Sequence, residues 1–192
     1  MKKVFSILTV LILAFAIISC GSSAKSKKQE RTVPAGFPEF VKKAILNAPE
    51  DVLVGVGNAK LASLSQSRTI STNRARAEIS RQMVTIIQDM IRDYQASSEV
   101  DPAAALSFQE NITVSLSKAT LQGATVVDQD IDADGQVWTV VFLGKTNVAQ
   151  EINQAQAAAR LAIPAMASFS AEDRMNAAFD RVNNQEIRVG SN

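Results

Sequence analysis

The chain has 192 residues, with 20 lysines and arginines against 19 aspartates and glutamates, and a formal net charge of +1. This balance is far from the strongly basic composition of a nucleic-acid-binding domain, and the length predicts one domain around one core. The chain has no histidine and a single cysteine. It therefore lacks the commonest acid–base group and cannot form an internal disulfide.

The N-terminus has the pattern of a secretory signal. Lys2 and Lys3 precede an unbroken apolar run that ends at Ser19 and Cys20. A charged start, an apolar middle and a small residue at the end are typical of a cleaved signal peptide. The alternative, a retained transmembrane helix, needs roughly 20 apolar residues, and the run is shorter. We expect residues 1–19 to be removed.

The lone cysteine sits where this run stops, in the segment "IISC". The segment resembles the lipobox of bacterial lipoproteins, and Ile18 in place of a small residue resembles its relaxed form in spirochaetes and related bacteria. The resemblance implies that Cys20 is acylated, becomes the first mature residue and anchors the protein to the membrane through several acyl chains. Gly21 after the cysteine favours the outer membrane, by analogy with other lipoproteins. Both the periplasmic and the surface face of that membrane stay open as the location of the domain. The alternative is a spare thiol after an ordinary signal peptide.

Residues 20–36 are small, polar and locally basic, without apolar periodicity, and predict a flexible tether. Lys25, Lys27, Lys28 and Arg31 would favour anionic headgroups beside the acyl chains. A plain solvated spacer is an equal alternative.

The folded domain is expected over residues 37–183. It opens with "FPEFVKKAIL", where Pro38 suits the first turn of a helix. A strand follows near 51–58, "DVLVGVGNAK", whose valines point to one face and whose Leu53, Gly55 and Gly57 point to the other. A dinucleotide fingerprint would need a third glycine where Lys60 stands, so the glycines indicate close approach of a neighbouring element.

Two helices are predicted next. The first spans 71–95 after a serine-rich polar stretch, and its apolar stripe comprises Ala75, Ile79, Met83, Ile86, Met90 and Tyr94. The second follows Asp101-Pro102, ends at Gly123, and has a weaker stripe of Ala105, Phe108, Ile112, Ser115 and Ala119. Alternation of Ile112, Val114 and Leu116 leaves a strand as the alternative there.

A hairpin is expected near 124–143, turning at Asp134-Gly135. In that register Ile131 faces Trp138, and the aspartates at 128, 130 and 132 project from the opposite side, where they discourage edge pairing.

The same stretch also begins like a calcium loop, with Asp130, Asp132 and Asp134 before a glycine. The bidentate glutamate of such a loop is replaced by Val141. Alternate carboxylates on a strand also lie about 6.5 Å apart, too far to share one ion. The sequence favours the hairpin and leaves calcium as the alternative.

Two further helices are expected over 147–163 and 172–182. The first has a face of small residues that continues to Met166, and Pro164 limits it. Ser170 and Asp173 have the spacing of a capping box for the second. Residues 184–192 lack a pattern and are expected to be a tail.

The order of these segments resembles the LPP20 family of bacterial lipoproteins over most of residues 34–183. The similarity rests on "PEFV", "DVLVGVGNAK", "NRARAEISRQM", "LSKATLQGATVVDQDIDADGQVWTVVFLG" and "EDRMNAAFD". Phe40 departs from a tryptophan that many relatives carry. The resemblance implies an α+β domain with a small antiparallel or mixed sheet packed by helices, in some relatives similar to flagellar-envelope accessory proteins. It carries no active site onto this chain.

The sequence thus predicts a non-catalytic binding or assembly module of the bacterial cell envelope. We expect a membrane anchor at Cys20, a protein partner or a second copy of the chain, and no nucleic acid, metal or cofactor. A calcium-responsive module using the three aspartates is the alternative.

Overall fold

The computed structural model describes residues 31–118, 123–185 and 187–190. The described elements, in chain order, are α2 (Glu39–Leu46), β1 (Val52–Ala59), α3 (Leu64–Ser97), α4 (Pro102–Lys118), β2 (Thr125–Ile131), β3 (Val137–Gly144), α5 (Lys145–Ala162), the 3-10 turn Pro164–Met166, α6 (Glu172–Asn183) and β4 (Val189–Gly190). The strands form one mixed sheet in the order β2-β3-β1-β4, in which β4 alone runs parallel to its neighbour. The predicted α+β fold class is confirmed.

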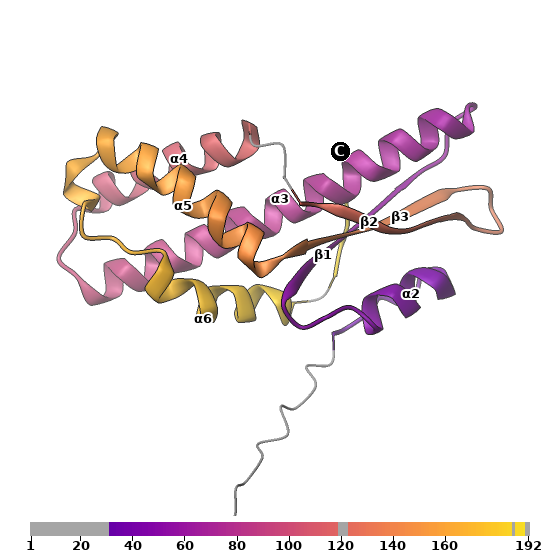
Figure 1. Ribbon diagram of the computed structural model, residues 1–192, viewed down its shortest axis with the longest axis horizontal. Helices are drawn as coiled ribbons and strands as arrows, with labels where there is room; N and C mark the ends of the chain where they lie inside the picture. Colours follow the sequence, from indigo (N-terminus) through magenta and orange to yellow (C-terminus); the bar gives the residue numbers. More distant parts are fainter. Residues whose placement is uncertain (1–30, 119–122, 186, 191–192) are drawn as a thin grey trace, which may run out of the picture.

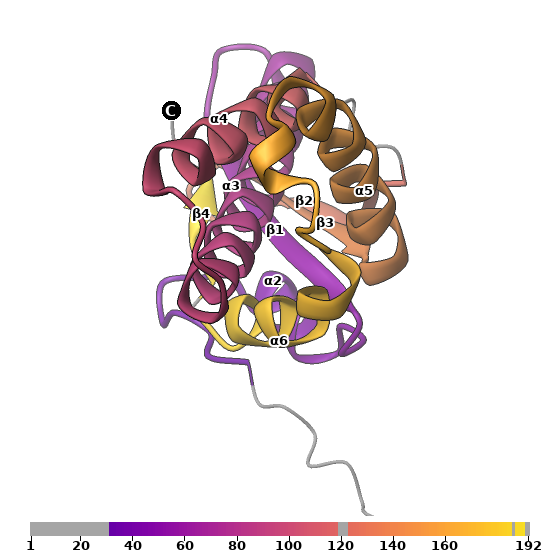
Figure 2. The same ribbon diagram turned by 90° about the vertical axis from the view of Figure 1, so that its left-hand side faces the viewer.

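The helix α3 belongs to both halves of the molecule (Figure 1). One end of it lies across the sheet, and the other end joins α4, α5 and α6 in a helical bundle, seen end-on in Figure 2. The shorter α2 covers the opposite face of the sheet. The described residues therefore build two cores, one on each side of the sheet.

The alternation predicted for β1 decides which core each side chain enters. Leu53 belongs to the core that α3 shares with the bundle, whereas Val54 and Val56 pack with α2. A Cβ on Gly55 would lie 2.2 Å from the carbonyl oxygen of Ala75. The backbone of α3 thus comes closer to β1 than any side chain would allow, which confirms the interpretation of this glycine.

The helix α3 is longer than predicted. All six residues of the predicted stripe are buried, but the helix begins at Leu64, and the serine-rich stretch is its first turns. Ser63 is the N-cap, and its hydroxyl accepts from the amide of Gln66. Ser71 is fully buried and its hydroxyl lies 2.7 Å from that of Thr139 on β3. A small side chain such as that of Ser71 fits here because α3 packs directly on β3 at this point.

Expectations for α4 and α5 hold in their main features. Ala105, Phe108 and Ile112 are buried, so the strand alternative for this segment is wrong, and Leu116 joins the core where Ser115 was expected. Ala119 lies outside the described residues. On α5, Ile152, Ala155 and Ala159 are buried, Ala162 is exposed, and Met166 is buried in the following turn.

The capping box expected at Ser170 is wrong. Ala171 is the N-cap of α6 and no side chain of the first turn caps it. The amide of Ala171 instead donates to the side-chain oxygen of Gln156 on α5, at 2.9 Å. A residue of another helix therefore satisfies the amide of the N-cap residue of α6.

The hairpin forms, but its register differs by one residue from the prediction. Gly135, with φ of +77°, donates its amide to the carbonyl of Asp132, and Ile131 pairs with Val137 instead of Trp138. A bulge lies between Val126 and Asp128. The Asp132 carboxylate stabilises this wider turn by accepting from the amides of Asp134 and Gln136 within it and from the Trp138 indole of β3.

The last described residues join the sheet. Ile187 is buried in the α2 core, and Val189–Gly190 pairs with β1. A Cβ on Gly190 would lie 2.0 Å from the carbonyl oxygen of Arg74, so this strand passes directly over α3. Residues 187–190, expected within a tail, therefore form part of the domain.

Candidate functional site

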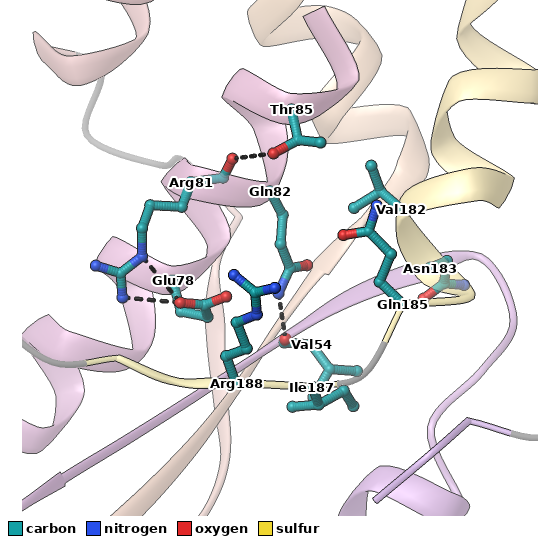
Figure 3. A pocket seen from close by; sticks show the side chains of 10 residues that line it. All are labelled: Val54, Glu78, Arg81, Gln82, Thr85, Val182, Asn183, Gln185, Ile187 and Arg188. Atoms are coloured by element: carbon teal, nitrogen blue, oxygen red, sulfur yellow. Dashed lines mark hydrogen bonds and ion pairs between the residues drawn. The ribbon is translucent and has the colours of Figure 1, made fainter. Parts of the chain in front are cut away.

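A pocket of about 100 Å³ lies where the C-terminal segment crosses α3 (Figure 3). Three parts of the chain line it. They are α3 with Glu78, Arg81, Gln82 and Thr85; the end of α6 and the segment after it with Val182, Asn183, Gln185, Ile187 and Arg188; and β1 with Val54. The pocket forms there because the chain after α6 has to cross α3 before it can pair with β1, as β4, at the edge of the sheet.

Glu78 is the buried acid of this pocket. Its side chain is 8% exposed, and its Oε2 accepts from Nε of Arg81 at 2.9 Å and lies 2.7 Å from Nη2 of the same residue. A buried carboxylate needs such a partner, since burial of an unpaired charge costs several kcal/mol. The ion pair therefore cancels the charge of Glu78 within the pocket wall.

The polar side chains beside Glu78 are held in place by the backbone. Gln82 donates from Nε2 to the carbonyl oxygen of Val54 at 2.9 Å, and Thr85 donates to the carbonyl oxygen of Arg81 at 3.1 Å. Gln82 retains its amide oxygen as an acceptor. The α3 wall is thus preorganised and presents polar groups at fixed positions.

Arg188 enters the pocket from the opposite side (Figure 3). It is exposed, and its guanidinium makes no hydrogen bond or ion pair with the residues that the structure describes. A guanidinium offers five donors in a planar fork that matches a carboxylate. Among the described residues that line this pocket, Arg188 is therefore the charged group whose hydrogen-bond donors are all left over.

A shallower groove of about 390 Å³ continues from the pocket along α3. The two cavities share Arg81, Thr85 and Arg188. Beyond them the groove is lined by the aliphatic side chains of Val84 and Leu116, with polar residues at its edge. A polar pocket and a partly apolar groove thus meet at Arg188.

A second groove, of about 500 Å³, runs between α5 and α6. Its one lysine, Lys145, lies 3.7 Å from Asp180 and over the ring of Phe179, 4.8 Å from the centroid. The cation of this groove is already engaged, so the groove offers less to a charged ligand than the Arg188 pocket does.

Arg31 connects the start of the described chain to the pocket wall. It is buried, and its guanidinium donates to the carbonyl oxygens of Ala48, Pro49 and Val52 at 2.6–3.1 Å. It also donates to the side chain of Asn183, which lines the pocket. Burial lowers the pKa of Arg31, opposed by the nearby carboxylates at 50 and 51. The headgroup contact suggested for Arg31 is therefore wrong, since the side chain is inside the domain.

The aspartates of the calcium alternative do not converge. Asp132 accepts from the amides of Asp134 and Gln136 at Oδ1 and from the Trp138 indole N–H at Oδ2, all within 2.9 Å. These bonds, led by the indole, hold its pKa below the usual value. Asp130 accepts from the amide of the next residue. In the described part of the chain no group of three acidic, cysteine or histidine residues is placed to hold a metal ion.

The edge of the sheet at β2 is poorly suited to strand pairing. Val126, Val127 and Ile131 are 40–44% exposed there. However, the bulge distorts the strand, and the Asp130 carboxylate occupies the amide of Ile131 at 2.8 Å. Bulges and charges are devices that protect an edge from another chain. The predicted placement of the aspartates is wrong, because Asp130 pairs directly with Trp138 and Asp132 accepts from its indole, so both lie on the same side as Trp138. Protection of the edge by these aspartates stays a prediction.

The lipidation candidate Cys20 lies outside the described residues. No described helix has both the length and the apolar character needed to cross a bilayer.

Sequence reasoning missed Glu78 and Arg188. Glu78, Gln82 and Thr85 recur at helical spacing beside the apolar stripe of α3, which was a usable signal for a polar groove. No pattern marked Arg188, because its position depends on a strand of two residues.

The described residues form a single α+β domain with a small polar pocket. No protein-family model matches the chain, and no curated protein matches it.

Proposed function

We propose that the protein is a lipid-anchored binding module of the bacterial cell envelope that recognises its partner at the Arg188 pocket. The anchor is the acylated Cys20, and Gly21 after it favours the outer membrane. The proposal for the anchor rests on the charged start, the apolar run and the lipobox-like "IISC" at the N-terminus.

The observation that carries the binding role is the guanidinium of Arg188, which has no partner among the described residues and lines a preorganised pocket. Binding sites are concave and combine apolar walls with a few fixed polar groups. The pocket and the adjoining groove have this composition. The partner is another envelope protein or ligand, or a second copy of the chain.

A catalytic role has less support. The chain has no histidine, and its one cysteine is the proposed acylation site. The buried acid of the pocket, Glu78, is neutralised by its ion pair with Arg81. A general acid or base would need a titratable group free to exchange a proton with a substrate. We therefore propose a non-enzymatic function, and membership of the LPP20 family as its context.

In-cell cross-linking tests this proposal. A photoreactive amino acid replaces Gln88, which lines the groove, and in a matched strain it replaces the exposed Gln150 on α5. We expect a defined cross-linked product from position 88 and none from position 150. Cross-linking from neither position, or equally from both, would refute binding at this surface.

The anchor is tested separately with Cys20→Ala. We expect the wild-type protein to partition into detergent and to carry acyl chains by mass spectrometry. The variant should lose both properties and the cross-link from position 88. A variant that remains in the membrane fraction without acyl chains would refute anchoring through Cys20.

A further inference from the structure

From the charges and walls of the same pocket we infer its ligand class, which rests on the proposed binding function. We propose that the pocket binds a small monocarboxylate with an aliphatic substituent. The carboxylate pairs with the guanidinium of Arg188, and the aliphatic part lies in the groove over Val84 and Leu116.

The sign of the charge follows from the polar groups. Glu78 and Arg81 neutralise each other at 2.7 Å, so Arg188 supplies the uncompensated positive charge among the described lining residues. Two planar N–H donors of a guanidinium match the two oxygens of a carboxylate in a bidentate pair. An anion is therefore favoured over a cation or a neutral sugar.

The size and the single uncompensated charge favour a carboxylate over a phosphate. The pocket measures about 100 Å³, room for a small polar group. A phosphate would bring nearly two negative charges, of which the one guanidinium of Arg188 could neutralise only one, since Arg81 is already paired with Glu78. A carboxylate brings one charge, which Arg188 can neutralise alone.

The apolar part of the ligand follows from the groove. Val84 and Leu116 line it beyond Arg188, while Val54, Val182 and Ile187 form the apolar walls of the pocket itself. Covering such surface contributes about 25 cal/mol per Å². A ligand that carries only a carboxylate would leave this surface in water.

The experiment uses the full-length protein extracted in a nonionic detergent and titrated calorimetrically with 4-methylpentanoate. The neutral 4-methylpentanamide and inorganic phosphate are titrated in parallel. We expect 4-methylpentanoate to bind at least tenfold more tightly than either. Equal binding of the acid and the amide, or tighter binding of phosphate, would overturn the proposed ligand class.

Variants locate the site. Arg188→Gln should weaken binding at least tenfold, Arg188→Lys should restore part of it, and the control Arg76→Gln, an exposed arginine of α3 outside both cavities, should leave it unchanged. The melting temperature of Arg188→Gln should equal that of the wild type, because Arg188 has no described partner to lose. Unchanged affinity in Arg188→Gln would overturn the site.

The outcome is distinguishable from failure of the proposed function. If 4-methylpentanoate does not bind while the cross-link from position 88 persists, the ligand class is wrong and the binding role stands. If the cross-link is also absent, both proposals are wrong.

Discussion

Arg31 provides the sharpest test of how the domain is held together at the first described residue. Its guanidinium donates to three main-chain carbonyl oxygens and to the Asn183 side chain, and it forms no ion pair with a carboxylate among the described residues. Two of the carbonyls belong to the loop between α2 and β1, and the third is that of Val52, the first residue of β1. One side chain therefore joins the first described residue, that loop and the end of α6.

The change Arg31→Met keeps most of the apolar stem and removes all of these bonds. Hydrogen bonds from a charged donor contribute about 1.5–3 kcal/mol each, and the carbonyl of Ala48 would be left without this partner in a buried site. Part of this loss is offset, because methionine removes a charge that is unfavourable to bury. The lowered pKa of Arg31, which results from its burial, is consistent with that desolvation cost. We expect a net loss of about 2–4 kcal/mol in the free energy of unfolding.

The assay is urea unfolding followed by circular dichroism, with Arg76→Met as the matched control because that arginine is exposed. For a domain of this size a loss of 1 kcal/mol lowers the melting temperature by about 2–4 °C. Arg31→Lys should fall between the wild type and Arg31→Met, because one ammonium cannot reproduce the guanidinium fork. If Arg31→Met stays within about 0.5 kcal/mol of the Arg76→Met control, the reasoning is refuted.

Three further predictions concern stability. Gly57→Ala should destabilise the domain by about 2 kcal/mol or more, because the new Cβ would lie 2.2 Å from the Ser71 carbonyl oxygen. Gly36→Ala should be nearly neutral, because its Cβ would meet nothing within 4 Å. Equal melting temperatures of the two variants would contradict this. Asp132→Asn should cost about 1–2 kcal/mol at pH 7. The folded pKa of Asp132 is lowered from 3.8, so the stabilisation by its carboxylate is present above pH 3.8 and fades as the pH falls further. The free energies of unfolding of the wild type and Asp132→Asn, measured with urea, should therefore converge at acidic pH. A difference that stays constant with pH would count against this role of the Asp132 carboxylate. Arg181→Gln removes exposed contacts to two aspartates and should cost less than about 1 kcal/mol, less still in high salt; a larger, salt-independent loss by urea titration would be inconsistent with a surface ion pair.

The sequence determined those parts of the fold in which local periodicity and burial agree. The stripe of α3 and the alternation of Val54 and Val56 in β1 specify which side of each element enters a core, and the structure uses them as predicted. The same holds for Gly55, because close approach of a neighbouring element is one of the few reasons for a glycine inside a strand, and the carbonyl oxygen of Ala75 makes that approach.

Tertiary contacts decided the hairpin register and the cap of α6. A turn of two residues was the local preference at Asp134-Gly135, but in the observed, wider turn the Asp132 carboxylate accepts from the Trp138 indole of β3 and from two amides. At the start of α6, Gln156 of α5 accepts from the amide of Ala171, a contact that no spacing within 170–173 could reveal.

The candidate site depended most on the tertiary structure. The spacing of Glu78, Gln82 and Thr85 places polar groups on one side of α3, yet a pocket exists only because the chain after α6 crosses that side to reach β1. The burial of Arg31 has the same origin, because its acceptors come from segments up to 152 residues away. Periodicity reports which face of an element is buried, whereas the partners that meet across that face are fixed by the path of the whole chain.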